Sequence, residues 1–166
     1  MKIRKAKEED FNRIMKIYEH AREFMEATGN PNQWGPDKWP PESLIHQDIK
    51  SEKLYACVND EDFVIGVFFY DYGTDIEPTY KKIFGGSWLK SGPYGVVHRI
   101  ASDSSERGIG SFCLNWAFSQ SSHLRIDTHE DNKVMQACLL KNNFVHCGTI
   151  FLEKDNSPRL AFEKLQ

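Results

Sequence analysis

The sequence predicts a single α/β domain of the α+β kind, in which a mixed, mostly antiparallel central sheet of about seven strands is flanked by about four helices. Its length of 166 residues fits one domain, because domains usually hold about 100–200 residues. Segments with the apolar spacing of strands alternate with segments of helical spacing. A strand–helix–strand unit in the second half favours one parallel pair, while the outer strands can pair antiparallel as hairpins. We therefore treat residues 1–166 as one domain.

The first part of the chain reads as strand, helix, loop and helix. Residues 1–4 are a short strand, and apolar residues recur at helical spacing over 11–25, with Gly29 as a C-terminal stop. Residues 30–41 hold four prolines and cannot be regular structure, yet they carry two tryptophans. A second helix is expected from Glu42 to Lys50, with a proline in its first turn.

The middle of the chain predicts three strands. Residues 54–58 and 63–70 are rich in apolar and aromatic residues, and the turn at 59–62 joins them as a hairpin. Residues 73–92 show no clear pattern, and we expect a loop with a little strand or helix. Residues 94–101 include two adjacent valines, with a glycine before them and a serine after them, and predict a strand.

The second half begins with a clear helix whose core-facing stripe is Ile109, Phe112, Cys113, Trp116 and Ala117. A strand at 124–128, a helix at 132–142 and two strands at 144–152 and 159–163 follow. The strands on either side of the first of these helices should be parallel and joined by a right-handed crossover.

Composition and charge exclude several classes of protein. The net charge is -3 with both signs mixed along the chain, so the basic stripe that nucleic acids require is missing and no nucleic acid partner is expected. No apolar run reaches the length of about 18 residues needed to enter a membrane, and the N-terminus lacks the apolar stretch of a secretory signal. The four cysteines are Cys57, Cys113, Cys138 and Cys147, and none of them forms a C-x-x-C pair. We therefore expect buried free thiols in a cytoplasmic protein, and no bound metal.

One short segment carries a chemical signal. Gly108-Ile109-Gly110 joins the end of a predicted buried strand to the start of a helix. The first N–H groups of a helix have no partner within it, and the helix dipole adds partial positive charge there. Glycines let an anion approach the backbone, and Arg107 adds a full charge, so phosphate or pyrophosphate is the expected occupant. A tight turn without a ligand is the alternative, because a lone Gly-x-Gly is weak.

Two other phosphate-binding motifs do not fit this segment. The dinucleotide fingerprint requires a third glycine where Cys113 stands. The P-loop requires Gly-Lys followed by Ser or Thr, whereas Gly110 is followed by Ser111 and Phe112.

Residues 105–110, Ser-Glu-Arg-Gly-Ile-Gly, resemble the pyrophosphate motif of the GNAT N-acetyltransferase superfamily, Gln/Arg-x-x-Gly-x-Gly/Ala. Both glycines match, Ser105 replaces the first Gln or Arg, and residues 98–101 resemble the family strand whose backbone amides hold the pantetheine arm and the thioester carbonyl. Asn132 and Phe144 match the family's next helix, although Asn143 stands where a glycine is usual.

The resemblance implies the GNAT fold and an N-acetyltransferase that moves an acetyl group from acetyl-CoA to the primary amine of a small molecule by direct attack. Backbone N–H groups near Ile100 and Ala101 would stabilise the oxyanion. The contacts expected for acetyl-CoA are Ile100, Ala101, Ser102, Ser105, Arg107, Gly108, Ile109, Gly110, Ser111 and Asn132.

Four residues are candidates for taking the proton of the amine: His98, Asp127, His129 and Glu130. For Glu130, a solvated turn is the favoured alternative. His98 is the best placed, on the strand expected to face the thioester, although a core histidine is an equal alternative. Strand alternation puts His98 and Ile100 on one face. Asp127 and His129 lie at a strand end, where ligands collect in α/β sheets. The tyrosine that often serves as the family's general acid is replaced by Leu139.

The acceptor pocket is expected to include Trp34, Trp39 and Tyr70, although either tryptophan alone could simply cap the core. Two rival functions stay open. One is a non-catalytic acyl-CoA-binding regulatory or ligand-binding module of the same fold. Leu139 favours it, because leucine cannot replace the general acid. The other is a nucleotide-binding protein that uses the same turn. The sequence does not fix the acceptor or the oligomeric state, and a homodimer stays open.

Overall fold

The computed structural model describes all 166 residues and contains every helix and strand that the sequence predicts. Two short 3-10 helices, η1 (Glu8–Asp10) and η2 (Pro78–Lys81), are additional. The other elements, in chain order, are β1 (Lys2–Lys5), α1 (Phe11–Ala27), α2 (Glu42–Lys50), β2 (Leu54–Val58), β3 (Val64–Gly73), β4 (Tyr94–Ser102), α3 (Ile109–Ser121), β5 (His123–Thr128), α4 (Lys133–Lys141), β6 (Val145–Phe151) and β7 (Pro158–Leu165).

All seven strands form one sheet in the order β1-β2-β3-β4-β5-β7-β6. Every neighbouring pair is antiparallel except β4 and β5, which are parallel and joined through α3. The predicted mixed, mostly antiparallel sheet with one parallel pair is therefore confirmed. Strand β7 lies between β5 and β6, so the closing hairpin is built onto the edge of the parallel pair.

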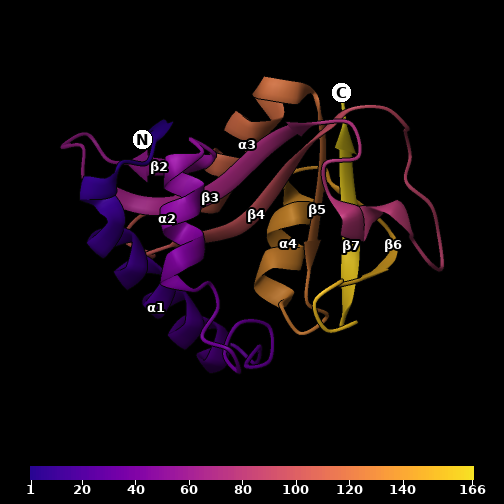
Figure 1. Cartoon of the computed structure of the whole chain (residues 1–166), viewed down its shortest axis with the longest axis horizontal. Helices are drawn as coiled ribbons and strands as arrows, with labels where there is room; N and C mark the ends of the chain where they lie inside the picture. The colour runs from indigo at the N-terminus through magenta and orange to yellow at the C-terminus, as the bar shows by residue number, and fades with distance from the viewer.

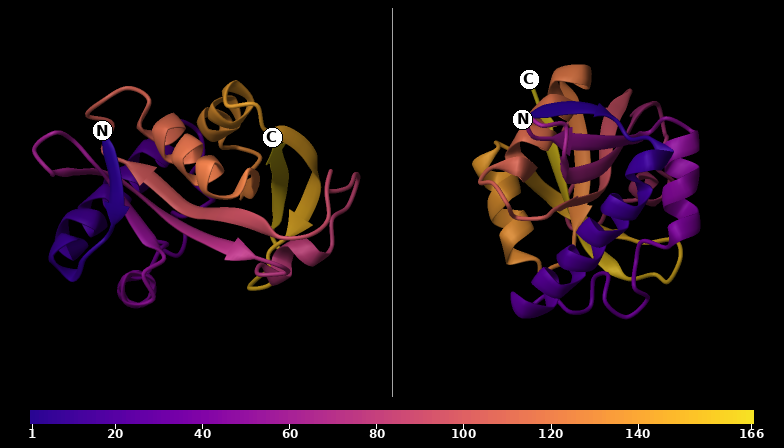
Figure 2. Two further views of the ribbon diagram at one scale, coloured as in Figure 1. Left: turned by 90° about the horizontal axis from the view of Figure 1, so that it is seen from above. Right: turned by 90° about the vertical axis from the view of Figure 1, so that its left-hand side faces the viewer.

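The helices cover the two faces of the sheet in pairs. Helix α1 packs on β3 and β4, with α2 beside it, whereas α3 packs on the opposite face of β3, β4 and β5 (Figures 1 and 2). Seen from above in Figure 2, α3 and α4 lie on one side of the strands and α1 on the other. Two apolar clusters of equal size fill the spaces beneath the two helix pairs.

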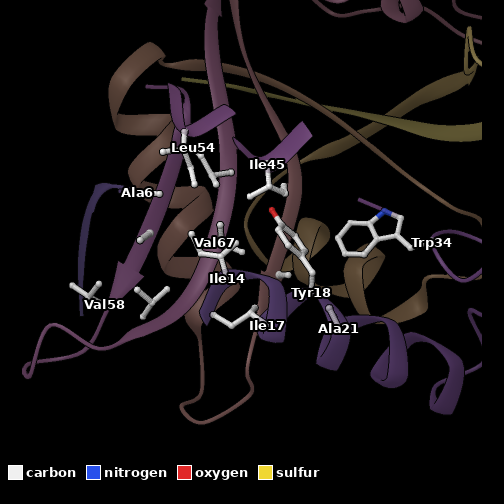
Figure 3. Packing of buried hydrophobic residues seen from close by; sticks show 14 residues of the cluster. Ala6, Ile14, Ile17, Tyr18, Ala21, Trp34, Ile45, Leu54, Val58 and Val67 are labelled. Carbon is white, nitrogen blue, oxygen red and sulfur yellow. The ribbon is translucent and has the colours of Figure 1, made fainter. Parts of the chain in front are cut away.

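The cluster beneath α1 and α2 is organised around Tyr18, which is fully buried (Figure 3). The Trp34 ring packs edge-on against the Tyr18 ring, with 5.9 Å between their centroids. The Tyr18 hydroxyl donates a hydrogen bond of 2.8 Å to the carbonyl oxygen of Arg99 in β4. A core side chain therefore holds the middle of β4 in place.

Strand β4 is irregular at this point. Arg99 has a φ of 53°, and the pairing with β3 slips by one residue between Val67 and Phe69. This bulge reverses the expected alternation, because Ile100 packs in the cluster beneath α3 and α4 instead of sharing a face with His98. The prediction that His98 and Ile100 share one face is wrong for that reason.

Strands β4 and β5 separate soon after they meet. They pair only at Gly95 with Leu124 and at Val96 with Arg125, although both strands continue further. From Val97 onward, the edge of β4 that faces β5 has no strand partner, so its backbone polar groups are free to bind something else.

Residues 73–92 form mostly irregular structure, as expected. The segment contains η2 and a single bridge from Phe84 to Thr149, and it buries Tyr80 against residues of β4, β6 and β7 in a third apolar cluster. The four cysteines are free thiols, and three of them are buried, while Cys138 is partly exposed. Among the helices, none is both long and apolar enough to cross a membrane.

Candidate active site

A cleft of about 270 Å³ opens where β4 and β5 separate. It is bounded by the loop between α1 and α2, the segment around η2, the ends of β4 and β5, the start of α4, and the loop between β6 and β7. The residues that line it are Met25, Gln33, Trp34, Trp39, Glu77, Thr79, Val97, His98, Arg99, Ile100, Ile126, Asp127, Thr128, Asn132, Met135, Leu152, Glu153, Lys154 and Arg159.

The cleft passes through the sheet, because residues from both of its faces line it. Val97 and Ile126 belong to the cluster beneath α3 and α4. His98 and Asp127, their neighbours in sequence, point to the opposite face. The cleft therefore has one side toward α3 and α4, which is mainly apolar, and one side toward α1 and η2, which carries the titratable groups.

The glycine turn lies at the N-terminus of α3. Gly108 has a φ of 83°, a left-handed conformation that favours glycine, and a Cβ there would meet no atom within 4 Å. The first hydrogen bond of the helix runs from the Phe112 N–H to the Gly108 carbonyl oxygen. The N–H groups of Ile109, Gly110 and Ser111 consequently have no acceptor within the helix and face outward as anion donors.

The turn adjoins the cleft through α4. A Cβ placed on Gly110 would lie 3.6 Å from the Cys138 sulfur, and the Ser111 hydroxyl oxygen lies 3.9 Å from the same atom. Met135, three residues earlier in α4, lines the cleft. One turn of α4 thus connects the helix N-terminus to the cleft, although the glycines themselves do not line it.

Asp103 shapes the loop that leads to the turn. One of its carboxylate oxygens accepts hydrogen bonds from the Ser105 N–H at 2.9 Å and from the Ser105 hydroxyl at 2.6 Å. Its other oxygen accepts from the Arg13 guanidinium of α1. Arg107 is exposed, directly precedes the turn in the sequence, and forms no ion pair.

His98 and Glu77 form a pair on the titratable side of the cleft. The His98 Nε2 and the Glu77 Oε2 are 2.8 Å apart. Burial raises the pKa of Glu77, but the hydrogen bond and charge of His98 outweigh it, so the pKa lies below its ordinary value and the carboxylate is ionised. When the ring is neutral and Nε2 donates to this carboxylate, Nδ1 is the ring nitrogen with the free lone pair.

Asp127 lies on the same side, at the end of β5. Its Oδ2 accepts a hydrogen bond of 2.6 Å from the hydroxyl of the buried Tyr80. Burial and the negative charge of Asp127 raise the pKa of Tyr80 well above its ordinary value, so the hydroxyl stays protonated and donates. One oxygen of Asp127 is therefore used, and the other is open to the cleft.

Comparison with solved structures identifies the fold that carries this cleft. An acetyltransferase of the GNAT family from Streptococcus agalactiae is 29% identical, with a TM-score of 0.88, and the match covers 99% of this chain and 95% of that one. Acetyltransferases of the GNAT family from Listeria monocytogenes and Bacillus cereus match with TM-scores of 0.69 and 0.61, at 14% and 18% identity. These matches cover 98% and 99% of this chain and 93% and 97% of theirs.

This chain has the GNAT fold. The resemblance that residues 105–110 suggested is confirmed at the level of the fold. The neighbour from Streptococcus agalactiae supports acetyl transfer as the general activity. No protein-family model and no curated protein sequence matches the chain.

Within the GNAT fold, the residues matched to the family's motifs take consistent places. Asn132 is the N-cap of α4, since its side-chain oxygen accepts from the Met135 N–H at 3.0 Å. Asn143, in the usual glycine position, has a φ of 65°, the left-handed conformation in which asparagine is tolerated. Leu139 is fully buried in the core, so its position supplies no polar group to the cleft.

Two residues predicted for the site lie elsewhere. Tyr70 is buried on the α3 side of the sheet, where its ring packs against those of Tyr55 and Trp116, 6.1 and 5.8 Å away. Its neighbour Phe69 is the one that faces His98, since side chains alternate along a strand. His129 does not line the cleft, and its Nδ1 accepts a hydrogen bond of 3.0 Å from the Asp131 N–H.

Trp34 and Trp39 both line the cleft from the loop between α1 and α2. Trp34 is also a core residue, so both expectations for it hold together. The Lys154 ammonium lies 4.3 Å from the centre of the Trp39 ring, which joins this loop to the one between β6 and β7. The Gln33 side chain accepts a hydrogen bond of 2.9 Å from Asn132 and ties the same loop to α4.

Several residues of the cleft were missed by sequence reasoning. Glu77 comes from the segment without a clear pattern, and Arg159 comes from the start of the last strand. Tyr80, from the same segment as Glu77, does not line the cleft but holds Asp127. Thr128 is buried, lines the cleft, and has a hydroxyl without a hydrogen-bond partner. Only Thr128 had a signal, because it ends the strand that carries Asp127.

Proposed function

We propose that the protein transfers the acetyl group of acetyl-CoA to the primary amine of a small molecule by direct attack. The observation that carries this proposal is the cleft between β4 and β5, which has an anion-binding turn beside its apolar side and the His98–Glu77 pair on its other side. A turn alone would suit any phosphate. A turn that lies one turn of α4 away from the cleft, together with the pair inside the cleft, suits a long thioester whose ends need different surroundings.

The residues beside α3 fit coenzyme A. The unpaired N–H groups of Ile109, Gly110 and Ser111 would bind the pyrophosphate, with the Arg107 guanidinium next to them. The amide-containing arm would lie along the unpartnered edge of β4 near Ile100, Ala101 and Ser102, where it replaces the missing strand. Asn132 and Ser105 would act through the shape of α4 and of the loop, since their side chains already have protein partners.

His98 is the proposed base. An ionised Glu77 holds Nε2–H, fixes the orientation of the ring, and stabilises the imidazolium that forms when Nδ1 takes a proton. This is the arrangement of a base held by a third group. Asp127 remains the second candidate, because one of its oxygens is open to the cleft. His129 is the weakest, because its Nδ1 lone pair already accepts a hydrogen bond.

The transfer then balances as follows. The neutral amine nitrogen forms a bond to the thioester carbonyl carbon, and its proton goes to His98. Backbone N–H groups of the bulged part of β4, near Ile100 and Ala101, would stabilise the oxyanion. The C–S bond breaks and the electron pair leaves with sulfur. A thiol has a pKa of about 8.5, so the thiolate leaves without a strong acid, and the imidazolium or water protonates it.

The size of the cleft supports a small acceptor. Its volume of about 270 Å³ lies just below the usual range of about 300–1,000 Å³ for small-molecule sites. Two of the loops that line it are joined by the contact of Lys154 with Trp39, which restricts the access of a folded protein segment.

A screen of primary amines tests the proposal. Amino acids, polyamines and aminoglycosides would be incubated with acetyl-CoA, thiol release followed with a thiol-detecting dye, and the acetylated product identified by mass spectrometry. We expect at least one amine to release thiol in step with a product heavier by one acetyl group. Calorimetry that detects no acetyl-CoA binding would contradict the proposal at its base.

One observation favours a second function, a module that binds acyl-CoA without efficient chemistry. Leu139 occupies the family's tyrosine position, and no tyrosine lines the cleft. Tight acetyl-CoA binding with no thiol release above the uncatalysed rate, for every amine in the screen, would select this alternative.

A further inference from the structure

Arg159 is a buried charge without a carboxylate partner. It lines the cleft from β7, and only 7% of its surface is exposed. Its guanidinium donates a hydrogen bond of 2.9 Å to the carbonyl oxygen of Pro158, and it forms no ion pair. Burial lowers the pKa of Arg159, and the negative charges of Asp127 and Asp155 offset only part of that effect.

Arg125 shows what the fold normally does with such a residue. It is also 7% exposed, yet its Nε lies 3.2 Å from the Glu163 carboxylate, and its other end donates to the Lys90 carbonyl oxygen at 2.6 Å. The partly buried Arg99 is likewise paired, with Asp48 at 2.8 Å. Burying a charge costs free energy unless the charge is paired. Arg159 has no carboxylate partner within the protein, whereas Arg125 and Arg99 each have one.

Arg159 faces the reaction side of the cleft. Asp127 of β5 is opposite Ala161 of β7, so Arg159, two residues before Ala161, points to the same face as Asp127. Diagonal neighbours of this kind lie about 7–8 Å apart at the backbone. A carboxylate with one open oxygen and a guanidinium with open donors therefore stand close together on one wall without contacting each other.

The other charges of the cleft do not occupy Arg159. Glu77 is paired with His98, and Arg99 with Asp48. Lys154 lies over the Trp39 ring and 3.7 Å from Asp37. Glu153 is exposed, at the rim. The unmet donors of Arg159 are thus available to a bound molecule.

We infer that the acceptor is an amine that also carries a carboxylate, an amino acid in the chemical sense, and that Arg159 binds this carboxylate. The planar guanidinium donates two parallel N–H groups to a carboxylate, which fixes the orientation of the acceptor. Asp127 then faces the amino group, and His98 takes the proton that this group releases as it attacks the thioester. The short separation of Asp127 and Arg159 favours a free amino acid over a peptide. The inference rests on the proposed acetyl transfer and names its substrate class.

Matched acceptors test the inference. Each amino acid is compared with its own carboxamide, which keeps the amine and side chain but removes the charge, and with the dipeptide that moves the carboxylate one residue away. We expect kcat/KM to favour the amino acid roughly 100-fold over the carboxamide. Arg159→Gln should reduce that ratio to within a few-fold of one, and Arg159→Lys should leave an intermediate ratio. Lys154→Gln, which removes another cation that lines the cleft, should keep the wild-type ratio.

Failure of the inference differs from failure of the proposed function. Equal turnover of amino acids and carboxamides would overturn the role of Arg159 while acetyl transfer stands. A higher rate with dipeptides would change the proposed substrate class to peptide termini.

If turnover is slow, a binding measurement tests the same inference. N-acetyl amino acids should raise the melting temperature of the wild type but not of Arg159→Gln, with acetyl-CoA affinity equal in both as the control for folding. Equal shifts in both proteins would overturn the inference.

Discussion

Two histidine–glutamate pairs sit on neighbouring strands of this protein, and their surroundings differ. His98 of β4 lies 2.8 Å from Glu77, with 20% and 23% of the two side chains exposed. His123 of β5 lies 2.5 Å from Glu163, with 5% and 0% exposed. The same two residue types therefore form one pair in a cleft and one pair in the interior.

The difference lies in what else each pair contacts. The His123 Nδ1 faces the Pro93 carbonyl oxygen at 3.0 Å, so both of its ring nitrogens are used. Glu163 is shared with Arg125 and with the Leu89 N–H. The His98 ring has one polar partner and lines the cleft. A histidine with both nitrogens bound holds the fold together, whereas one with a free nitrogen in a cleft is able to move a proton.

The largest expected effect comes from the buried pair. His123→Leu leaves Glu163 buried with only Arg125 as a charged partner, and breaking a buried pair costs about 3 kcal/mol or more. The melting temperature should fall by roughly 6–12 °C. Calorimetric scanning would measure it, and activity per folded molecule should stay close to that of the wild type. A loss of activity without loss of stability would erase the distinction between the two pairs.

The matching change in the cleft should lower turnover and leave stability almost unchanged. His98→Gln keeps a polar group of similar size beside Glu77, so stability should change by less than about 1 kcal/mol, as for partly exposed pairs. Turnover should fall by ~10²-fold, with acetyl-CoA affinity unchanged. Steady-state kinetics and calorimetry on the same samples measure both. A variant that is destabilised as strongly as His123→Leu would assign His98 to the structural class.

The apolar side of the cleft is tested at the turn. Gly108→Val places a branched side chain where the phosphates should approach, and acetyl-CoA should bind at least tenfold more weakly, or about 1.4 kcal/mol. Gly29→Val is the matched control, because Gly29 has a nearly equal φ of 85° and equally open surroundings at the end of α1. Equal affinities in the two folded variants would remove the pyrophosphate from this turn.

The smallest effect is expected at Arg107. Its exposed charge should add about two- to fivefold to acetyl-CoA affinity at low salt, and this share should vanish as salt screens it. Arg107→Ala should therefore make acetyl-CoA binding less dependent on salt. Lys50→Ala, at the C-terminus of α2, should leave that dependence unchanged. If both variants keep the wild-type salt dependence, Arg107 points into solvent and the backbone alone carries the site.

The sequence predicted the features that local patterns specify. The glycine turn, the strand that carries His98 and the capping residue Asn132 all lie within continuous segments of regular period. Leu139 was likewise located by counting along one helix.

The residues that complete the site could not be predicted in this way. Glu77 meets His98 across 21 residues, and Tyr80 meets Asp127 across 47, through a segment with little regular structure. The bulge at Arg99 depends on a positive φ in a residue that rarely adopts one, and it is held by the hydroxyl of Tyr18 from another element. Tyr70 was assigned to the wrong face of the sheet. An error of one residue along a strand is enough for this, because successive side chains point to opposite faces.

The most direct test of the account is the pH dependence of kcat/KM, measured side by side for the wild type and His98→Gln with the best acceptor of the screen. In the wild type, the rate should fall on the acidic side as the base becomes protonated. In His98→Gln, the rate near neutral pH should be ~10²-fold lower, and that acidic limb should be gone. Full activity in His98→Gln, with the acidic limb still present, would contradict the account and move the base to Asp127.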